Sequence, residues 1–168
     1  NPQAAPQEGY RHLSEVSSWC RSARDAVAEA LAADELPILL GGDHSLALGS
    51  IAAVRAHCDR VGRPLAVLWL DAHTDFNTPA SSPSGNLHGM PLAALCGHGH
   101  LDLLALAGAT PVVEPAQVAL LGVRSIDAIE KQQVVASGLQ VQDMRRIDEF
   151  GMRAAVAEVL ERVARPGV

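Results

Sequence analysis

The chain has 168 residues, with 13 Lys and Arg against 19 Asp and Glu and a formal net charge of −6. This acidic balance argues against nucleic acid or an anionic membrane as a partner, because both are polyanions. The length suits one domain, and a hydrophobic content of 48% with only 3% aromatic residues predicts a core of Ala, Val and Leu. No apolar run approaches the roughly 20 residues that span a bilayer. We also recognise no signal peptide, and the three cysteines lack metal-binding spacing. We therefore expect reduced thiols in a cytoplasmic protein.

Helices and strands are predicted to alternate along the chain. The spacing of apolar residues predicts helices over 10–34, 46–58, 91–107 with a Gly-rich break, 127–137 and 148–164. Short apolar runs predict strands over 38–40, 65–70, 118–123 and 139–142, and residues 76–89 are expected to form a loop. This alternation predicts an α/β fold with a parallel sheet between helices. No strand precedes the first helix or follows the last one, so we expect the sheet to be incomplete at both ends.

Two clusters of Asp and His directly follow predicted strands. The sequence Asp-Ala-His-Thr-Asp occupies residues 71–75, and Gly-Gly-Asp-His-Ser occupies residues 41–45. Carboxylate and imidazole ligands suit Mn²⁺, Zn²⁺ or Fe²⁺, and open α/β sheets bind ligands at the carboxyl ends of their strands. Either cluster alone is well explained by turn or cap residues, with Asp43 and Ser45 suited to capping the following helix. Two such clusters on successive strands favour a metal-dependent enzyme.

Three motifs in this order resemble those of the ureohydrolase family, which includes the arginases. They are Gly-Gly-Asp-His-Ser-Leu-Ala-Leu-Gly-Ser at 41–50, Asp-Ala-His-Thr-Asp-Phe-Asn-Thr-Pro at 71–79 and Ser-Gly-Asn-Leu-His-Gly at 84–89. The resemblance implies that residues 1–168 form part of an arginase-like domain with a three-layer αβα fold. It also implies two Mn²⁺ ions, hydrolysis of L-arginine to L-ornithine and urea, and assembly into homotrimers or homohexamers.

The resemblance also implies roles for individual side chains. One Mn²⁺ would be held by His44, Asp71 and Asp75, and the other by Asp71 and His73, with Asp71 bridging. Catalysis would involve Asp75 and His88, the latter in proton transfer. The alternative for His88 is an N-cap or loop hydrogen bond.

Substrate contacts are implied for a further set of polar residues. They are Asn77, Ser82, Ser84, Asn86, Asp127 and Glu130. Asn77 and Ser84 would bind the α-carboxylate of arginine, and Asp127 and Glu130 belong to the segment that binds its α-amino group. That segment departs from the family pattern at Ser125, Ala128 and Ile129. Asp127 is equally suited to capping the helix that follows it.

Two other functions remain open at this stage. The chain has no counterpart of the family's later Asp-x-Asp metal motif before Val168, so it would hold only part of the ligand set. A non-catalytic fragment is therefore one alternative. The other keeps the chemistry but changes the substrate, as in agmatinase, guanidinobutyrase or formimidoylglutamase. His98 and His100 could mimic a metal-binding tract, but the glycines beside them favour a surface loop.

Overall fold

The computed structural model describes residues 6–108 and 110–163. The chain separates into two compact units. The first comprises Asn1–Pro64 and Asp75–Val112, and the second comprises Leu65–Thr74 and Val113–Val168. The prediction of one domain over 1–168 stays a prediction.

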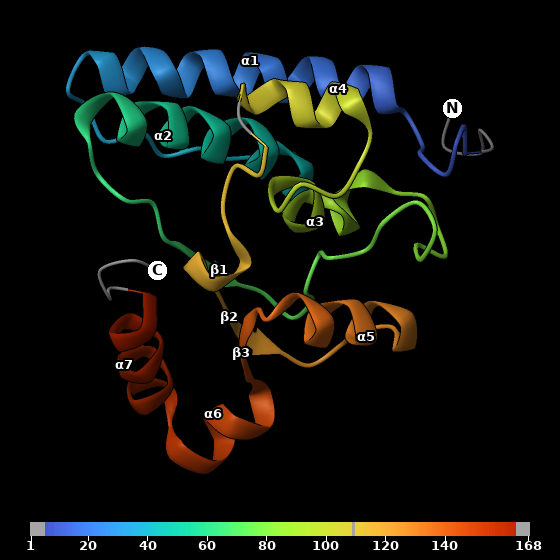
Figure 1. The fold of residues 1–168 in the computed structure, drawn as a ribbon, viewed down its shortest axis with the longest axis vertical. Coiled ribbons are helices and arrows are strands. Elements are labelled where there is room, and N and C mark those ends of the chain that lie inside the picture. Colours follow the sequence, from blue (N-terminus) through green and yellow to red (C-terminus); the bar gives the residue numbers. More distant parts are fainter. Residues whose placement is uncertain (1–5, 109, 164–168) are drawn as a thin grey trace. The chain divides into compact units, whose positions relative to one another are not determined.

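Two long helices, α1 (Leu13–Ala32) and α2 (Ala47–Val61), lie side by side in the first unit (Figure 1). The buried residues of α1 recur every three or four positions and form one stripe: Ser17, Cys20, Ala23 and Val27. The helices approach closely because Gly49 has no side chain, and a Cβ atom there would overlap the carbonyl oxygen of Cys20. The Cys20 thiol also donates to the carbonyl oxygen of Ser45 at 3.1 Å. Small residues thus allow the backbones of these two helices to approach closely.

Short helical elements complete the first unit. They are the 3₁₀ turns η1 (His44–Leu46), η2 (Leu87–Gly89) and η3 (Ala105–Ala107) and the helices α3 (Pro91–Leu95) and α4 (Leu101–Leu104). The predicted break in the 91–107 helix is confirmed. It falls at Gly97 and Gly99, whose φ angles of 95° and 158° favour glycine.

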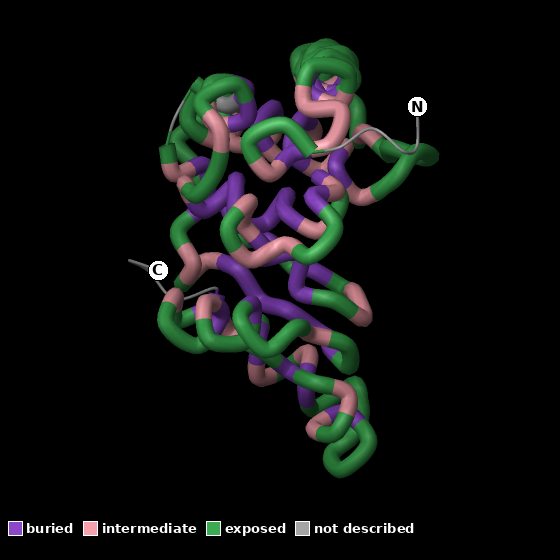
Figure 2. The backbone as a smooth tube through the Cα atoms, turned by 90° about the vertical axis from the view of Figure 1, so that its right-hand side faces the viewer, coloured by how far each residue is buried: buried purple, intermediate pink, exposed green. Residues whose placement is uncertain are grey.

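The second unit contains a parallel sheet with the order β1-β2-β3. Its strands are β1 (Val67–Leu70), β2 (Val118–Val123) and β3 (Gln140–Asp143). Its helical elements are η4 (Pro115–Gln117), α5 (Ala128–Ser137), α6 (Met144–Phe150) and α7 (Met152–Val163). Every residue of β2, the central strand, is buried (Figure 2). Ala119 and Leu121 of β2 pack against Val159 and Val163 of α7. Parallel strands beside helices are what the α/β prediction requires.

The predicted strand at 38–40 is wrong. This segment has no strand pairing in the part of the chain that the structure describes, and Ile38 and Leu40 are 78% and 85% exposed. An apolar run favours a strand, but a strand forms only where a neighbour accepts and donates its backbone hydrogen bonds.

The predicted single helix at 148–164 is also wrong. Two helices, α6 and α7, occupy this region and are separated at Gly151, which has a φ of 83°. Asp143 begins α6 by accepting a hydrogen bond from the amide of Arg146 at 2.8 Å. The predicted end at Ala164 lies outside the described residues.

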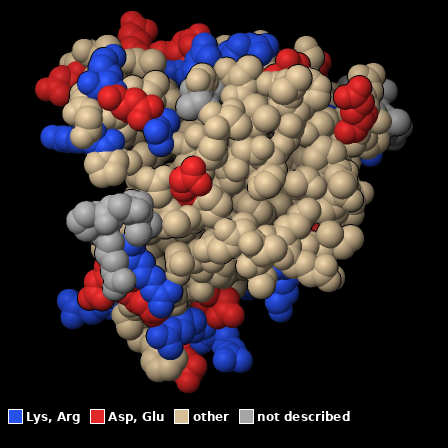
Figure 3. Space-filling model, viewed as in Figure 1, with Lys and Arg blue, Asp and Glu red and all other residues tan. Residues whose placement is uncertain are grey.

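The charged side chains of the second unit gather over α6 and α7, at the lower left of Figure 3. Among the described helices, none combines the length and the apolar character needed to cross a membrane.

Candidate metal centre

His44 and Asp75 face each other within the first unit. His44 is the first residue of η1, and its Nδ1 atom lies 2.7 Å from Oδ2 of Asp75. Asp75 is 6% exposed and has a φ of 46°, in the left-handed region. Its carbonyl oxygen accepts from the amides of Leu92 and Ala93 at the start of α3, at 3.0 and 3.3 Å, which fixes this backbone conformation. The fold therefore brings together an imidazole nitrogen and a buried carboxylate oxygen from distant parts of the sequence.

Asp71 and His73 form a second pair, at the carboxyl end of β1 in the second unit. Oδ1 of Asp71 accepts from the amide of His73 at 2.9 Å and lies 3.3 Å from its Nδ1 atom. The amide of Asp71 donates to Leu121 at 3.1 Å, which continues the pairing of β1 with β2. The carbonyl oxygen of Ala72 accepts from the amides of Arg124 and Ser125 at 2.8 and 3.0 Å. These bonds hold the turn against the end of β2.

The carboxylate oxygens and imidazole nitrogens of both pairs are suitable ligand atoms for a divalent cation. Oδ2 of Asp75 is buried, and its 2.7 Å contact with Nδ1 of His44 has the distance of an ion pair without meeting the geometry of a hydrogen bond. A buried carboxylate oxygen is stabilised only by a proton, a donor or a cation. Carboxylate and imidazole ligands together are characteristic of Mn²⁺ and related ions. The residues present therefore fit a metal.

His88 lies beside Asp43 in the first unit. It belongs to η2, its side chain is 52% exposed, and its Nδ1 atom is 3.7 Å from Oδ2 of Asp43. The other oxygen of Asp43 accepts from the amide and hydroxyl of Ser45 at 3.0 and 2.5 Å. Asp43 thus caps the 3₁₀ turn η1 rather than the following helix as predicted, because α2 begins at Ala47 with Leu46 as its N-cap. The same side chain also faces a candidate catalytic histidine.

The loop at 76–89 is held by its own polar side chains. Asn77 is 8% exposed, and its Oδ1 atom accepts from the hydroxyl of Ser81 at 2.8 Å. Ser82 accepts from the amide of Gly85 at 3.0 Å. Ser84 accepts from the amide of Asn86 at 3.2 Å. The sequence analysis did not identify Ser81 as a residue of this site. The one indication in the sequence is that its hydroxyl lies four residues after Asn77, whose side-chain oxygen it binds.

Asp127 and Glu130 form a capping box at the start of α5. Oε2 of Glu130 lies 3.4 Å from the amide of Asp127, and Glu130 is 4% exposed. The N-cap alternative for Asp127 is therefore confirmed. The substrate contact of both residues stays a prediction.

His100 also caps a helix. Its Nδ1 atom accepts from the amide of Asp102 at 3.1 Å at the start of α4. This bond occupies one of the two ring nitrogens of His100 and gives the side chain a role in local structure.

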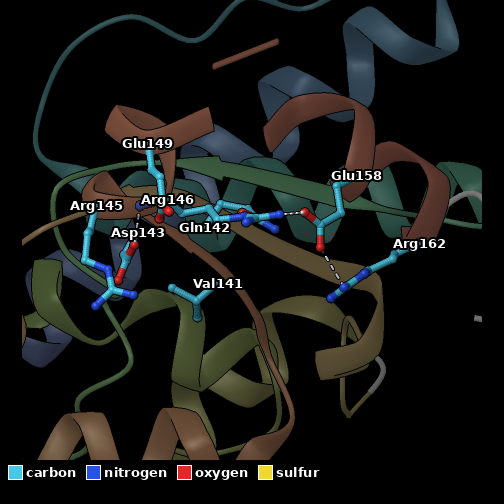
Figure 4. A pocket seen from close by; sticks show the side chains of 8 residues that line it. All are labelled: Val141, Gln142, Asp143, Arg145, Arg146, Glu149, Glu158 and Arg162. Carbon is cyan, nitrogen blue, oxygen red and sulfur yellow. Dashed lines mark hydrogen bonds and ion pairs between the residues drawn. The ribbon is translucent and has the colours of Figure 1, made fainter. Parts of the chain in front are cut away.

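A separate hollow of about 330 Å³ lies between β3, α6 and α7 (Figure 4). Glu158 accepts from Arg146 at 3.0 Å and from Arg162 at 2.7 Å. The hydrogen bond from Arg146 lowers the pKa of Glu158. The Arg146 guanidinium also lies 4.0 Å from the centre of the Phe150 ring. This network joins the two helices, and none of the predicted site residues contributes to it.

Comparison with known proteins supports the family resemblance that the three motifs indicate. A model of the Arginase family matches residues 7–168. The arginase of Brevibacillus brevis is 40% identical over 158 residues, which cover 94% of this chain and 52% of the relative. The arginase of Bacillus caldovelox is 41% identical over 150 residues, which cover 89% of this chain and 49% of the relative. The chain thus spans about half the length of these curated relatives.

A solved structure extends the agreement to the fold. The crystal structure of arginase from Bacillus cereus matches with a TM-score of 0.88 and 39% sequence identity. The match covers 94% of this chain and 53% of that protein. The predicted arginase-like α/β fold is confirmed, and the three-stranded parallel sheet is consistent with an incomplete form of that fold.

Proposed function

Because the chain belongs to the arginase family, we propose that the protein containing it hydrolyses L-arginine to L-ornithine and urea with two Mn²⁺ ions. The observation that carries the proposal is the pair of His44 and Asp75, in which an imidazole nitrogen lies 2.7 Å from a buried carboxylate oxygen. The test is urea release from L-arginine by the protein after loading with Mn²⁺, compared with the same protein after chelation.

Four side chains of this chain would hold the ions. His44, Asp71 and Asp75 would bind one ion, and Asp71 and His73 the other. When bound, such a pair of ions lowers the pKa of a water so that hydroxide is available near neutral pH. The backbone carbonyl of Asp75 already accepts from the start of α3, and the side chain of Asp71 already accepts from the amide of His73. These bonds support the view that both ligands are held in place before a metal binds. The chain also needs ligands that it does not carry, so we expect weak metal binding by these 168 residues alone.

His88 would supply the proton for the leaving amine. Its imidazole is half exposed, as a group that must meet a substrate needs to be. The two nitrogens of an imidazole allow it to accept a proton and to donate one during turnover.

The loop residues would select the substrate. Because Ser81 occupies Oδ1 of Asn77, the amide NH₂ is the group that Asn77 can offer to a carboxylate. Ser84 would add a hydroxyl donor, with Ser82 and Asn86 shaping the same loop. Asp127 and Glu130 would contact the α-amino group. Agmatinase or a related activity is the alternative, and kcat/KM measured with arginine and with agmatine separates the two.

A non-catalytic role for these 168 residues alone is the second alternative. We expect no urea release from the purified chain, because the family's later Asp-x-Asp metal motif has no counterpart in these 168 residues. Measurable turnover by this chain would contradict that account.

We also propose that the protein is cytoplasmic and forms homotrimers or homohexamers. Its three cysteines are free, which suits a reducing compartment. Light scattering coupled to size-exclusion chromatography tests the assembly, and a monomer would contradict it.

A further inference from the structure

Asp43 is placed to control the orientation of His88. Its Oδ2 atom lies 3.7 Å from Nδ1 of His88, a distance within reach of an ion pair but longer than a hydrogen bond. Such contacts often tighten only when the substrate binds. The position of Asp43 is set independently, because Oδ1 accepts two bonds from Ser45.

Ser45 makes this anchor rigid. It is 2% exposed, and its carbonyl oxygen accepts from the thiol of Cys20 on α1. The side chains of His88 and Asp43 are both exposed, at 52% and 59%, but Oδ1 of Asp43 is held by Ser45, which ties this carboxylate to the packed helices. Of the two side chains, Asp43 is the one that can orient the other.

We infer that Asp43 is a positioning residue that holds the proton of neutral His88 on Nδ1 and turns Nε2 toward the substrate. The inference rests on the proposed function, in which His88 handles the proton of the leaving amine. A carboxylate can only accept a hydrogen bond, so the ring nitrogen facing it carries the hydrogen when this contact shortens to a hydrogen bond. The opposite nitrogen then has a lone pair to accept a proton and later to donate it.

The substitution Asp43→Asn tests this assignment. Asparagine is as good an N-cap as aspartate, so the bonds from Ser45 can persist. Its NH₂ group can donate to Nδ1 of His88 and so favour the tautomer with the proton on Nε2. Asp143→Asn is the matched control, because Asp143 caps α6 in the same way.

The first measurement is the tautomer of His88 in the 168-residue chain, from long-range proton–nitrogen NMR correlations assigned with His88→Gln. We expect the proton on Nδ1 in the wild type and a shift toward Nε2 in Asp43→Asn, with no change in Asp143→Asn. A wild-type proton on Nε2, or identical spectra for wild type and Asp43→Asn, would overturn the inference.

The second measurement is kinetic and uses the Mn²⁺-loaded protein that contains this chain. We expect kcat to fall about 10- to 100-fold in Asp43→Asn, as when the partner that orients a functional histidine is lost. KM for arginine should stay within about two-fold, because ground-state binding is unchanged. An unchanged kcat, or a loss of bound Mn²⁺ that matches the loss of activity, would overturn the inference. A wild-type protein without activity would contradict the proposed function, while the NMR result would still decide the role of Asp43.

Discussion

His44 and Asp75 meet with Nδ1 and Oδ2 only 2.7 Å apart. Two lone pairs at this separation repel each other unless a proton or a cation lies between them. Asp75 is held in a left-handed conformation by the start of α3, so the backbone cannot easily move its carboxylate away. This contact joins one side chain from each of the motifs at 41–45 and 71–75.

The bridging role proposed for Asp71 predicts an asymmetry between metal-site variants. Asp71→Ala should remove both ions and abolish activity in the protein that contains this chain, because one carboxylate serves both. His44→Ala should weaken one ion preferentially. Metal analysis by mass spectrometry after gel filtration checks this, and two ions retained in Asp71→Ala would contradict the bridge.

Substrate selection should depend on the loop at 76–89. Changing Asn77 and Ser84 together to Ala should raise KM for arginine and leave agmatine, which lacks the α-carboxylate, little affected. Each lost hydrogen bond to a charged group costs roughly 1.5–3 kcal/mol, about ten-fold or more in kcat/KM. Ser81→Ala should have a smaller effect in the same direction, because it only releases the Asn77 side chain. Equal losses for both substrates would argue against a carboxylate contact.

His88→Ala should lower kcat by about a hundred-fold or more, as expected when a general acid–base group is lost. His57→Ala is the control, because His57 lies on α2 and contacts Arg60 rather than the candidate site. Steady-state kinetics with arginine measure both variants. A normal kcat in His88→Ala would leave His88 with only a structural role in its loop.

The contact between α1 and α2 should tolerate no side chain at Gly49. Gly49→Ala would place its Cβ atom on the Cys20 carbonyl, so we expect a loss of about 1–3 kcal/mol or more in unfolding free energy. Gly89→Ala is the control, since a Cβ atom there meets nothing within 4 Å. Urea denaturation followed by circular dichroism compares the two. Equal stability of both variants would show that the helices move apart easily.

The thiol of Cys20 should be unreactive in the folded protein. Burial raises the pKa of Cys20 to about 11 from the ordinary 9.0. Because the folded-state pKa is the higher one, the protonated thiol contributes stability below pH 9 that is lost as pH rises toward 11. Iodoacetamide at pH 8 should therefore modify the partly exposed Cys58 first and Cys20 only after unfolding. Mass mapping of peptides checks the order, and early labelling of Cys20 would contradict it.

The sequence by itself determined the alternation of helices and strands, because apolar spacing reports which face of each element is buried. It also determined which ligand atoms the motifs at 41–45 and 71–75 offer, since the carboxylate and imidazole groups of Asp and His do not depend on the fold. The caps at Asp43 and Asp127 were readable for the same local reason: a side chain bonds an amide two or three residues away.

Only the tertiary structure decided which of these elements found partners. The apolar run at 38–40 resembles a strand in its sequence, but strand pairing depends on a neighbouring backbone that local sequence does not specify. Gly151 separates α6 from α7 with a φ of 83°, which glycine adopts without steric cost, and the apolar spacing of the sequence did not reveal this break. The contacts of His44 with Asp75 and of His88 with Asp43 likewise depend on distant segments meeting. Local patterns encode propensity and chemistry, whereas distances between remote side chains follow from packing.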